Sequence, residues 1–305
     1  MNRRSRGRAP AGPVDPDAPP PPLAPLVAGV ASALSPLARR ILAPNPGAMT
    51  GPGTNTYLVG IDEVAVIDPG PDDDGHLDAI IGCGGDRIRW IVCTHTHADH
   101  APAAARLAER TGAEVLAHSS RGGLRIDAAL ADGDAVEGTE FRLRAVHTPG
   151  HASDHLCYLL EQERLLFSGD HVMEGSTVVI VPPDGDMAAY LDSLRRLLDL
   201  RPRLRAIAPG HGRLIEDPAA AIGAYLTHRG EREEQIIAVL AAADGPVDPA
   251  GVVTSVYDGL ADELVPWARQ SVWAHLRKLA GDGRATSTDA DDPDASWSLV
   301  PPVPR

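Results

Sequence analysis

Four predicted strands of this chain are each followed by a segment that carries a histidine or an aspartate. This recurrence limits the folds that the chain can adopt. The first of these ends carries the segment Thr94–His100, which reads T-H-T-H-A-D-H and directly follows a buried strand at 90–93. At each of the three later ends a glycine, which permits a tight turn, comes directly before the polar side chain. These later ends carry His151, Asp170 and His211. One such loop alone could be a solvated segment, but four strand ends of this kind indicate a metal site.

Imidazole nitrogens and carboxylate oxygens are donors that suit zinc or a similar borderline metal. In an extended loop, His95 and His97 can point to one metal, while Asp99 and His100 reach a second. Two neighbouring divalent cations lower the pKa of a bridging water to near neutral, so that hydroxide is available to attack a substrate. Asp99 can orient that hydroxide and take up its proton, so we predict a catalytic role for it in addition to metal ligation. The sequence therefore predicts two zinc ions, and iron or manganese would suit the same donors.

The first part of the chain is rich in short apolar runs with helical segments between them, which indicates the α/β class and a sandwich. After residue 228 the pattern becomes helical and closes with a hairpin near Trp297, which is the outline of a winged helix. The expected strands of the first part are 57–59, 64–67, 90–93, 114–117, 141–146, 156–160, 165–167 and 206–208. The expected helices are 77–81, 101–110, 187–200, 231–243, 249–259 and 266–280.

We divide the chain into a tail at 1–38, a catalytic domain at 39–227 and a winged-helix-like domain at 228–305. The tail is rich in arginine and proline and cannot bury enough surface to offset its chain entropy, so we expect it to be disordered. A signal peptide is the alternative, but aspartates in its basic region and prolines in its apolar region argue against it. Three cysteines with no Cys-x-x-Cys pair indicate no disulfide framework and favour a cytoplasmic protein. The chain contains no stretch of about 20 apolar residues, so we predict no membrane span.

The charge balance argues against general binding of nucleic acids. Acidic residues outnumber basic ones by 42 to 28, a formal net charge of −14, whereas such binding depends on Lys and Arg that neutralise phosphates. Between Arg229 and Arg305 there are 7 basic and 13 acidic residues. We therefore expect no binding of double-stranded DNA, and we expect the C-terminal domain to wall the entrance of the active site or to form a homodimer contact.

The strand-end motifs together resemble those of the metallo-β-lactamase superfamily over about residues 45–212. The matching motifs are T-H-x-H-x-D-H at 94–100, T-P-G-H at 148–151, S-G-D at 168–170 and G-H at 210–211. The resemblance implies an αββα sandwich with the site along one edge. It implies that His95, His97 and His151 bind a first metal, that Asp99, His100 and His211 bind a second, and that Asp170 bridges both.

Departures from the family pattern narrow the branch. Asp170 stands where the best-known zinc β-lactamases carry cysteine, and His97 stands where diiron flavoproteins carry glutamate. The segment Asn45–Gly60, N-P-G-A-M-T-G-P-G-T-N-T-Y-L-V-G, resembles a β-lactamase-like subgroup that ends in a winged-helix-like domain. That subgroup includes a mitochondrial single-strand endoribonuclease, and its fungal relatives resemble acyl-carrier-protein thioesterases.

We expect a zinc-dependent hydrolase that acts on a small acyl ester, thioester or lactone, because the acidic chain offers no evident track for a polyanion. The alternatives are a single-strand endoribonuclease, with RNA as the partner, and a non-catalytic, metal-stabilised regulatory or binding protein. The complete set of seven ligands argues against the last. His155 and His171, close to the ligands in sequence, are candidates to bind substrate or donate a proton to the leaving group. Alternatively, they orient the ligands through hydrogen bonds.

Overall fold

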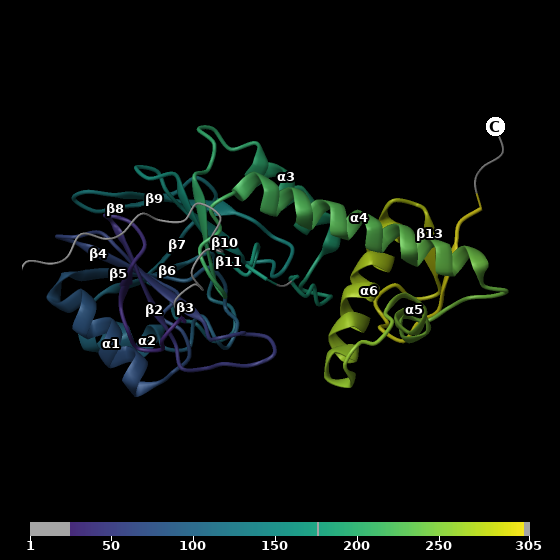
Figure 1. Cartoon of the computed structure of the whole chain (residues 1–305), viewed down its shortest axis with the longest axis horizontal. Coiled ribbons are helices and arrows are strands. Elements are labelled where there is room, and N and C mark those ends of the chain that lie inside the picture. The colour runs from purple at the N-terminus through teal and green to yellow at the C-terminus, as the bar shows by residue number, and fades with distance from the viewer. Residues whose placement is uncertain (1–24, 176, 302–305) are drawn as a thin grey trace, which may run out of the picture.

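The computed structural model describes residues 25–175 and 177–301, in which two β-sheets with helices on their outer faces are joined to a smaller helical unit (Figure 1). The first sheet has the strand order β1-β2-β3-β4-β5-β6-β7 and the second has the order β12-β11-β10-β9-β8. The first comprises β1 (Ser32–Ala33), β2 (Ala38–Leu42), β3 (Asn55–Val59), β4 (Val64–Ile67), β5 (Ile88–Val92), β6 (Glu114–Ala117) and β7 (Ala128–Ala129). The second comprises β8 (Ala135–Glu137), β9 (Arg142–His147), β10 (Leu156–Leu160), β11 (Leu165–Gly169) and β12 (Ala206–Pro209).

The central strands β3, β4, β10 and β11 are buried along their whole length, which explains why they are largely apolar. Successive side chains of a strand point to opposite faces. In β3, Tyr57 and Val59 therefore pack between the two sheets, whereas Leu58 packs outward among residues of α1 (Asp74–Gly84) and α2 (Ala104–Thr111). A third cluster joins the outer face of the second sheet to α3 (Met187–Leu198) and the start of α4 (Pro218–Ala242). The order of layers is helices, sheet, sheet, helices, so the expected α/β sandwich is confirmed.

Strand direction brings the polar strand ends to one edge. β4 runs parallel to β5, and β11 runs parallel to β12. β9 and β11 both run antiparallel to β10, so they share one direction. The carboxyl ends of β9, β11 and β12 therefore meet at one edge of the second sheet, where open α/β sheets bind their ligands.

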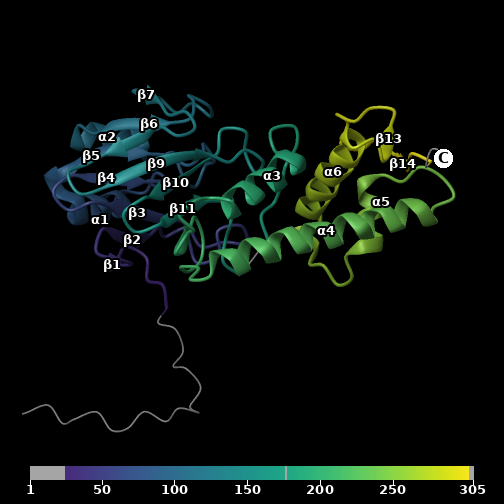
Figure 2. The same cartoon turned by 90° about the horizontal axis from the view of Figure 1, so that it is seen from above.

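A small helical unit follows the sandwich, and α4 belongs to both (Figure 2). The first turn of α4 is capped by the Asp217 carboxylate, which accepts a hydrogen bond from the Ala220 backbone N–H. Ile222 and Tyr225 pack on the sandwich, while Ile236 and Leu240 pack in the core of the C-terminal unit. That unit also contains α5 (Pro249–Val256), the short helix η2 (Asp262–Leu264), α6 (Val265–Gly281), β13 (Ala285–Ser287) and β14 (Trp297–Leu299). The predicted three helices and hairpin are confirmed.

The structure differs from the predicted elements at the N-terminal end of both units. α4 begins at Pro218 rather than at 231 and runs through the expected domain boundary at 227/228, because its first turns carry side chains that the sandwich buries. Residues 1–24 of the expected tail lie outside the described residues. Within residues 25–38, β1 pairs with β2, and the Gly29 N–H donates to the Leu42 carbonyl oxygen at 2.9 Å. No helix in the described part of the chain combines the length and the hydropathy that a membrane span requires.

Gly150 of the T-P-G-H motif is required for close packing in addition to its turn. Its φ is +142°, and a Cβ added there would lie 2.3 Å from the Cα of Tyr190 in α3. Gly112, which ends α2 with a φ of +73°, has no atom within 4 Å of such a Cβ. Gly150 thus allows α3 to approach the loop that carries His151.

We predict that Gly150→Ala lowers the free energy of unfolding by about 3 kcal/mol, because it adds a clash to an unfavourable φ. Gly112→Ala, the matched control, should cost only about 1 kcal/mol because it changes backbone strain alone. Urea unfolding followed by circular dichroism measures both losses. Equal losses would show that the approach of α3 does not require a glycine.

Candidate metal centre

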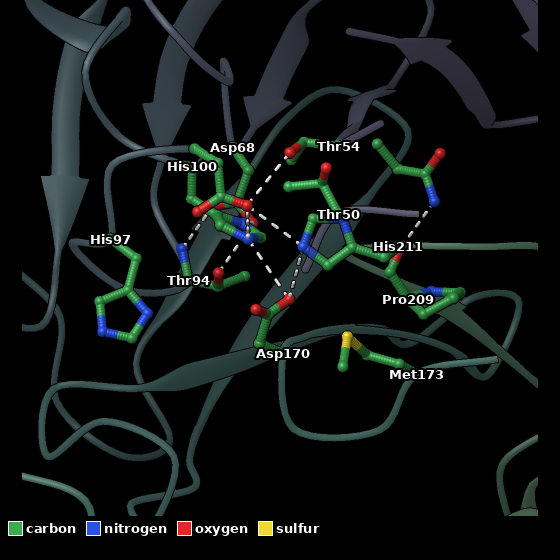
Figure 3. A network of polar contacts seen from close by, with 12 residues as sticks. Thr50, Thr54, Asp68, Thr94, His97, His100, Asp170, Met173, Pro209 and His211 are labelled. Carbon is green, nitrogen blue, oxygen red and sulfur yellow. Dashed lines mark hydrogen bonds and ion pairs between the residues drawn. The ribbon is translucent and has the colours of Figure 1, made fainter. Parts of the chain in front are cut away.

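The structure brings all seven predicted ligands together at one edge of the sandwich. Figure 3 shows His97, His100, Asp170 and His211 among them. The loop after β5 carries four of the seven, and the loops after β9, β11 and β12 carry one each. Their donor atoms fall into three groups, each within 4.8 Å. The groups are His95, His97 and His151; His95, His100 and Asp170; and Asp99, His100 and His211.

Three ring nitrogens converge in the first group. Nδ1 of His97 lies 3.0 Å from Nε2 of His95 and 3.0 Å from Nε2 of His151. Nδ1 of His151 is 2.8 Å from the carbonyl oxygen of Val179. A carbonyl oxygen only accepts, so the hydrogen of a neutral His151 ring is on Nδ1 and Nε2 presents a lone pair.

The tautomer of His95 follows from a chain of hydrogen bonds that ends at a carboxylate. The Thr94 hydroxyl donates to Oδ2 of Asp68 at 2.7 Å, so it must accept from Nδ1 of His95, 3.0 Å away. Nε2 of His95 therefore also presents a lone pair, and two lone pairs face Nδ1 of His97. A cation bound by all three nitrogens would satisfy them.

The carboxylate of Asp170 lies between the groups. Its Oδ1 is 3.3 Å from Nε2 of both His100 and His211, and its Oδ2 is 3.8 Å from Nε2 of His151. Asp99 approaches the same two rings from another side, with Oδ2 3.3 Å from His100 and 3.2 Å from His211. Asp170 thus contacts histidines of both predicted ligand sets.

Burial and charge act differently on the histidines. Burial lowers the pKa of His95 well below its usual value, and burial together with His151 lowers the pKa of His97. Burial acts in the same direction on His100 and His211, but there the carboxylates outweigh it. Asp170 and Asp99 raise the pKa of His211 to about 9 and, with Asp68, raise that of His100 well above its usual value. The carboxylates of Asp99 and Asp170 therefore favour positive charge beside them, which either protons or bound cations supply.

Asp68, at the end of β4, is a residue of the site that the sequence reasoning missed. It is buried, and its carboxylate accepts from the Thr94 N–H at 2.7 Å, the Thr94 hydroxyl at 2.7 Å and Nδ1 of His100 at 2.9 Å. It thereby turns Nε2 of His100 toward the centre, the usual role of a carboxylate behind a ligating histidine. The signal that could have found it is the strand-end rule itself, because Asp68 also follows a buried strand.

The segment Asn45–Gly60 braces the centre. Oδ1 of Asn45 accepts from the Thr54 N–H at 2.9 Å, and the Thr54 hydroxyl donates to Oδ2 of Asp99 at 3.2 Å. Asn55 donates through Nδ2 to the carbonyl oxygens of Pro209 and Gly212, both at 2.9 Å. The segment therefore holds both Asp99 and the loop that carries His211.

His155 and His171 lie behind the ligands, and both are fully buried. Nε2 of His155 accepts from the Asp170 N–H at 3.2 Å, and its Nδ1 is 2.9 Å from the Thr148 hydroxyl. The ring of His171 lies 4.8 Å from that of Tyr190. The contacts of His155 favour the alternative in which it orients a ligand, and the substrate role of both histidines stays a prediction.

A cavity of about 880 Å³ opens beside the cluster. Side chains of the cluster form one part of its lining, and residues of the C-terminal unit form another. The cluster residues that line it are His97, Asp99, His151, Asp170 and His211.

Comparison with known proteins identifies the family to which this chain belongs. Residues 49–211 match the metallo-beta-lactamase superfamily, and residues 249–297 match the beta-lactamase associated winged helix domain. The chain is 34% identical to the lactamase-like protein adaB of Aspergillus niger over 86% of both chains. It is 33% identical to an atrochrysone carboxyl ACP thioesterase of Aspergillus chevalieri over 82% of both. A metallo-beta-lactamase family protein of Thermus thermophilus has the same fold, with a TM-score of 0.73, 24% identity, and coverage of 88% of this chain and 100% of that one.

The chain belongs to the metallo-beta-lactamase superfamily and ends in that winged helix domain. The resemblance and the fold class predicted from the motifs are thus confirmed. The family and its thioesterase members support a hydrolase.

We predict that Asp68→Asn weakens zinc binding by about 10- to 100-fold, because the amide N–H₂ would face the donors of Thr94 and His100. Competition with a chromogenic chelator measures the affinity, and thermal unfolding checks that the fold persists.

Asp154→Asn is the matched control for this measurement. Asp154 is also buried and accepts from the Thr96 hydroxyl at 2.9 Å, but within the described residues it makes no hydrogen bond to a ring of the cluster. Its variant should keep the wild-type affinity. Equal affinities for the two variants would remove Asp68 from the support of the centre.

Proposed function

We propose that the chain is a binuclear metal-dependent hydrolase of acyl thioesters or related esters and lactones. The observation that carries the proposal is the convergence of Nε2 of His95 and Nε2 of His151, whose Nδ1 atoms face acceptors, on one ring nitrogen of His97. Both lie 3.0 Å from Nδ1 of His97, and a cation bound to the three nitrogens would satisfy them together.

The donor set fits two divalent metals, and zinc is our choice because its usual ligands in proteins are imidazole nitrogens and carboxylate oxygens. The first would be held by His95, His97 and His151, the second by Asp99, His100 and His211, and Asp170 would bridge them. When bound, such a pair supplies a water that is activated to hydroxide near neutral pH and positive charge for the developing oxyanion.

Asp99 is the residue of the cluster that we assign to proton transfer. Its Oδ2 is held by Thr54 and by the rings of His100 and His211, which fixes the direction of the carboxylate. Its side chain lines the cavity and is 26% exposed, so the other oxygen can reach substrate. Oδ1 would accept the proton of the attacking water and return it to the leaving group.

Acyl substrates are favoured over RNA by the distribution of positive charge. The arginines of α6 are engaged by the loop between β13 and β14, since Arg269 pairs with Asp294 and Arg277 with Asp291. Lys278 pairs with Glu233 at 2.8 Å. Few cations remain on this helix to neutralise phosphates, and the similarity to a named thioesterase points the same way.

We predict that the purified protein holds about two metal ions per chain and hydrolyses acyl N-acetylcysteamine thioesters. Dialysis against a chelator should lower the rate at least about a hundredfold, and adding back zinc, manganese or iron(II) in separate samples should identify the metal that restores it. Elemental analysis and a thiol-detecting assay provide the measurements. Single-stranded RNA is tested beside the thioesters.

Two outcomes would overturn this proposal. Chelator-sensitive cleavage of RNA with inert thioesters would make the chain an endoribonuclease. Less than one metal per chain with no turnover of either substrate would favour the non-catalytic alternative.

Substitution of one ligand separates a metal effect from a general one. His97→Ala should lower the metal content to about one per chain and the rate at least about a hundredfold, because one of three donors is lost. His118→Ala is the control: its ring stacks on His147 at 4.3 Å, outside the cluster. That variant should keep wild-type metal content and rate.

A further inference from the structure

The cavity beside the metal centre has a second wall, made by the C-terminal unit. Tyr257 follows α5, Leu264 ends η2, and Trp267 lies in the first turn of α6. All three line the cavity together with Met49 of the bracing segment and Val181 of the loop before α3. Apolar side chains from three distant segments thus face one space that is continuous with the metal cluster.

Three of these side chains are unusually exposed. Trp267 is 39% exposed, Met49 42% and Val181 36%, which places them among the few large apolar side chains of the described residues that solvent reaches. Apolar groups that gather on one concave surface mark a place where a ligand removes them from water. A small acyl group bound at the metals would leave this wall uncovered.

Two arginines, Arg229 and Arg232, also line the cavity, and among the described residues neither forms an ion pair with a carboxylate. Arg229 is buried and donates to the carbonyl oxygen of Val178. The guanidinium of Arg232 lies over the Tyr257 ring, 3.9 Å from its centroid, and donates to Oε1 of Gln235 at 2.9 Å. Apolar side chains outnumber these two arginines around the cavity, which suits the wall to an apolar part of a ligand.

We propose that this wall binds the acyl part of the substrate and selects apolar acyl groups of about eight carbons or more. The inference rests on the proposed thioester or ester hydrolysis and adds the size and character of the acyl group. Tyr257, Leu264 and Trp267 are its specificity-determining residues.

Acyl length should then control the rate. Each methylene that leaves water for an apolar surface favours binding by roughly fourfold. In the metal-loaded wild type, kcat/KM should rise at least about a hundredfold from the acetyl to the octanoyl thioester of N-acetylcysteamine.

Trp267→Ala tests the wall directly. It should lower kcat/KM for the octanoyl thioester about tenfold, mainly through KM, and leave the acetyl thioester almost unchanged. Trp267→Phe should restore most of the loss, because it restores apolar surface. Ile61→Ala, at an apolar residue that is 46% exposed and lies outside the cavity, is the matched control and should behave as wild type.

A binding measurement keeps this inference separate from the proposed reaction. Calorimetry with the non-hydrolysable thioether S-octyl-N-acetylcysteamine should detect binding to the wild type and to Ile61→Ala, and about tenfold weaker binding to Trp267→Ala. If every thioester is inert but this difference remains, the proposed reaction fails and the apolar wall stands. If acyl length has no effect on kcat/KM or binding, or if Trp267→Ala equals Ile61→Ala, the wall has no role in selection.

Discussion

Electrostatic repulsion at the sandwich edge is the constraint on which the remainder of the structure depends. The fold holds two carboxylates close together there, beside ring nitrogens whose lone pairs face one another. These groups stay together only if positive charge is present. Residues from several elements therefore hold the donor atoms of the cluster in place. Asp68 orients His100, Thr54 holds Asp99, and Asn55 ties the strands of the first sheet to the loop of His211. Loss of any of these braces lets the donor atoms move apart.

Much of the sandwich was predictable because its central strands are buried on both faces and read as apolar runs. β6 and β10 are found at their predicted limits. β1, β7 and β8 were missed because they are two or three residues long and carry little apolar surface. β2 was missed because Arg39 and Arg40 interrupt its apolar pattern. Short pairing of this kind depends on the neighbouring strand, which local sequence does not encode.

The cluster was predictable for the same reason that it forms, since each donor lies in a loop that follows a strand. The cavity was not predictable, because Met49, Val181 and Trp267 are far apart in the chain and share no motif. Only the path of α4 places them around one space. The position of His155 behind Asp170 likewise depends on packing between β10 and β11, and its spacing from His151 carries no such information.

The single helix that serves both units has a consequence for how this protein can diversify. A flexible linker would let the C-terminal unit drift, and the width of the cavity would vary with it. The unbroken 25-residue helix α4 instead fixes the distance between the ligand cluster and the cavity wall that the C-terminal unit forms. Exchange of side chains on α6 can then alter which substrates fit without disturbing the metal ligands, so substrate range and chemical step can change independently.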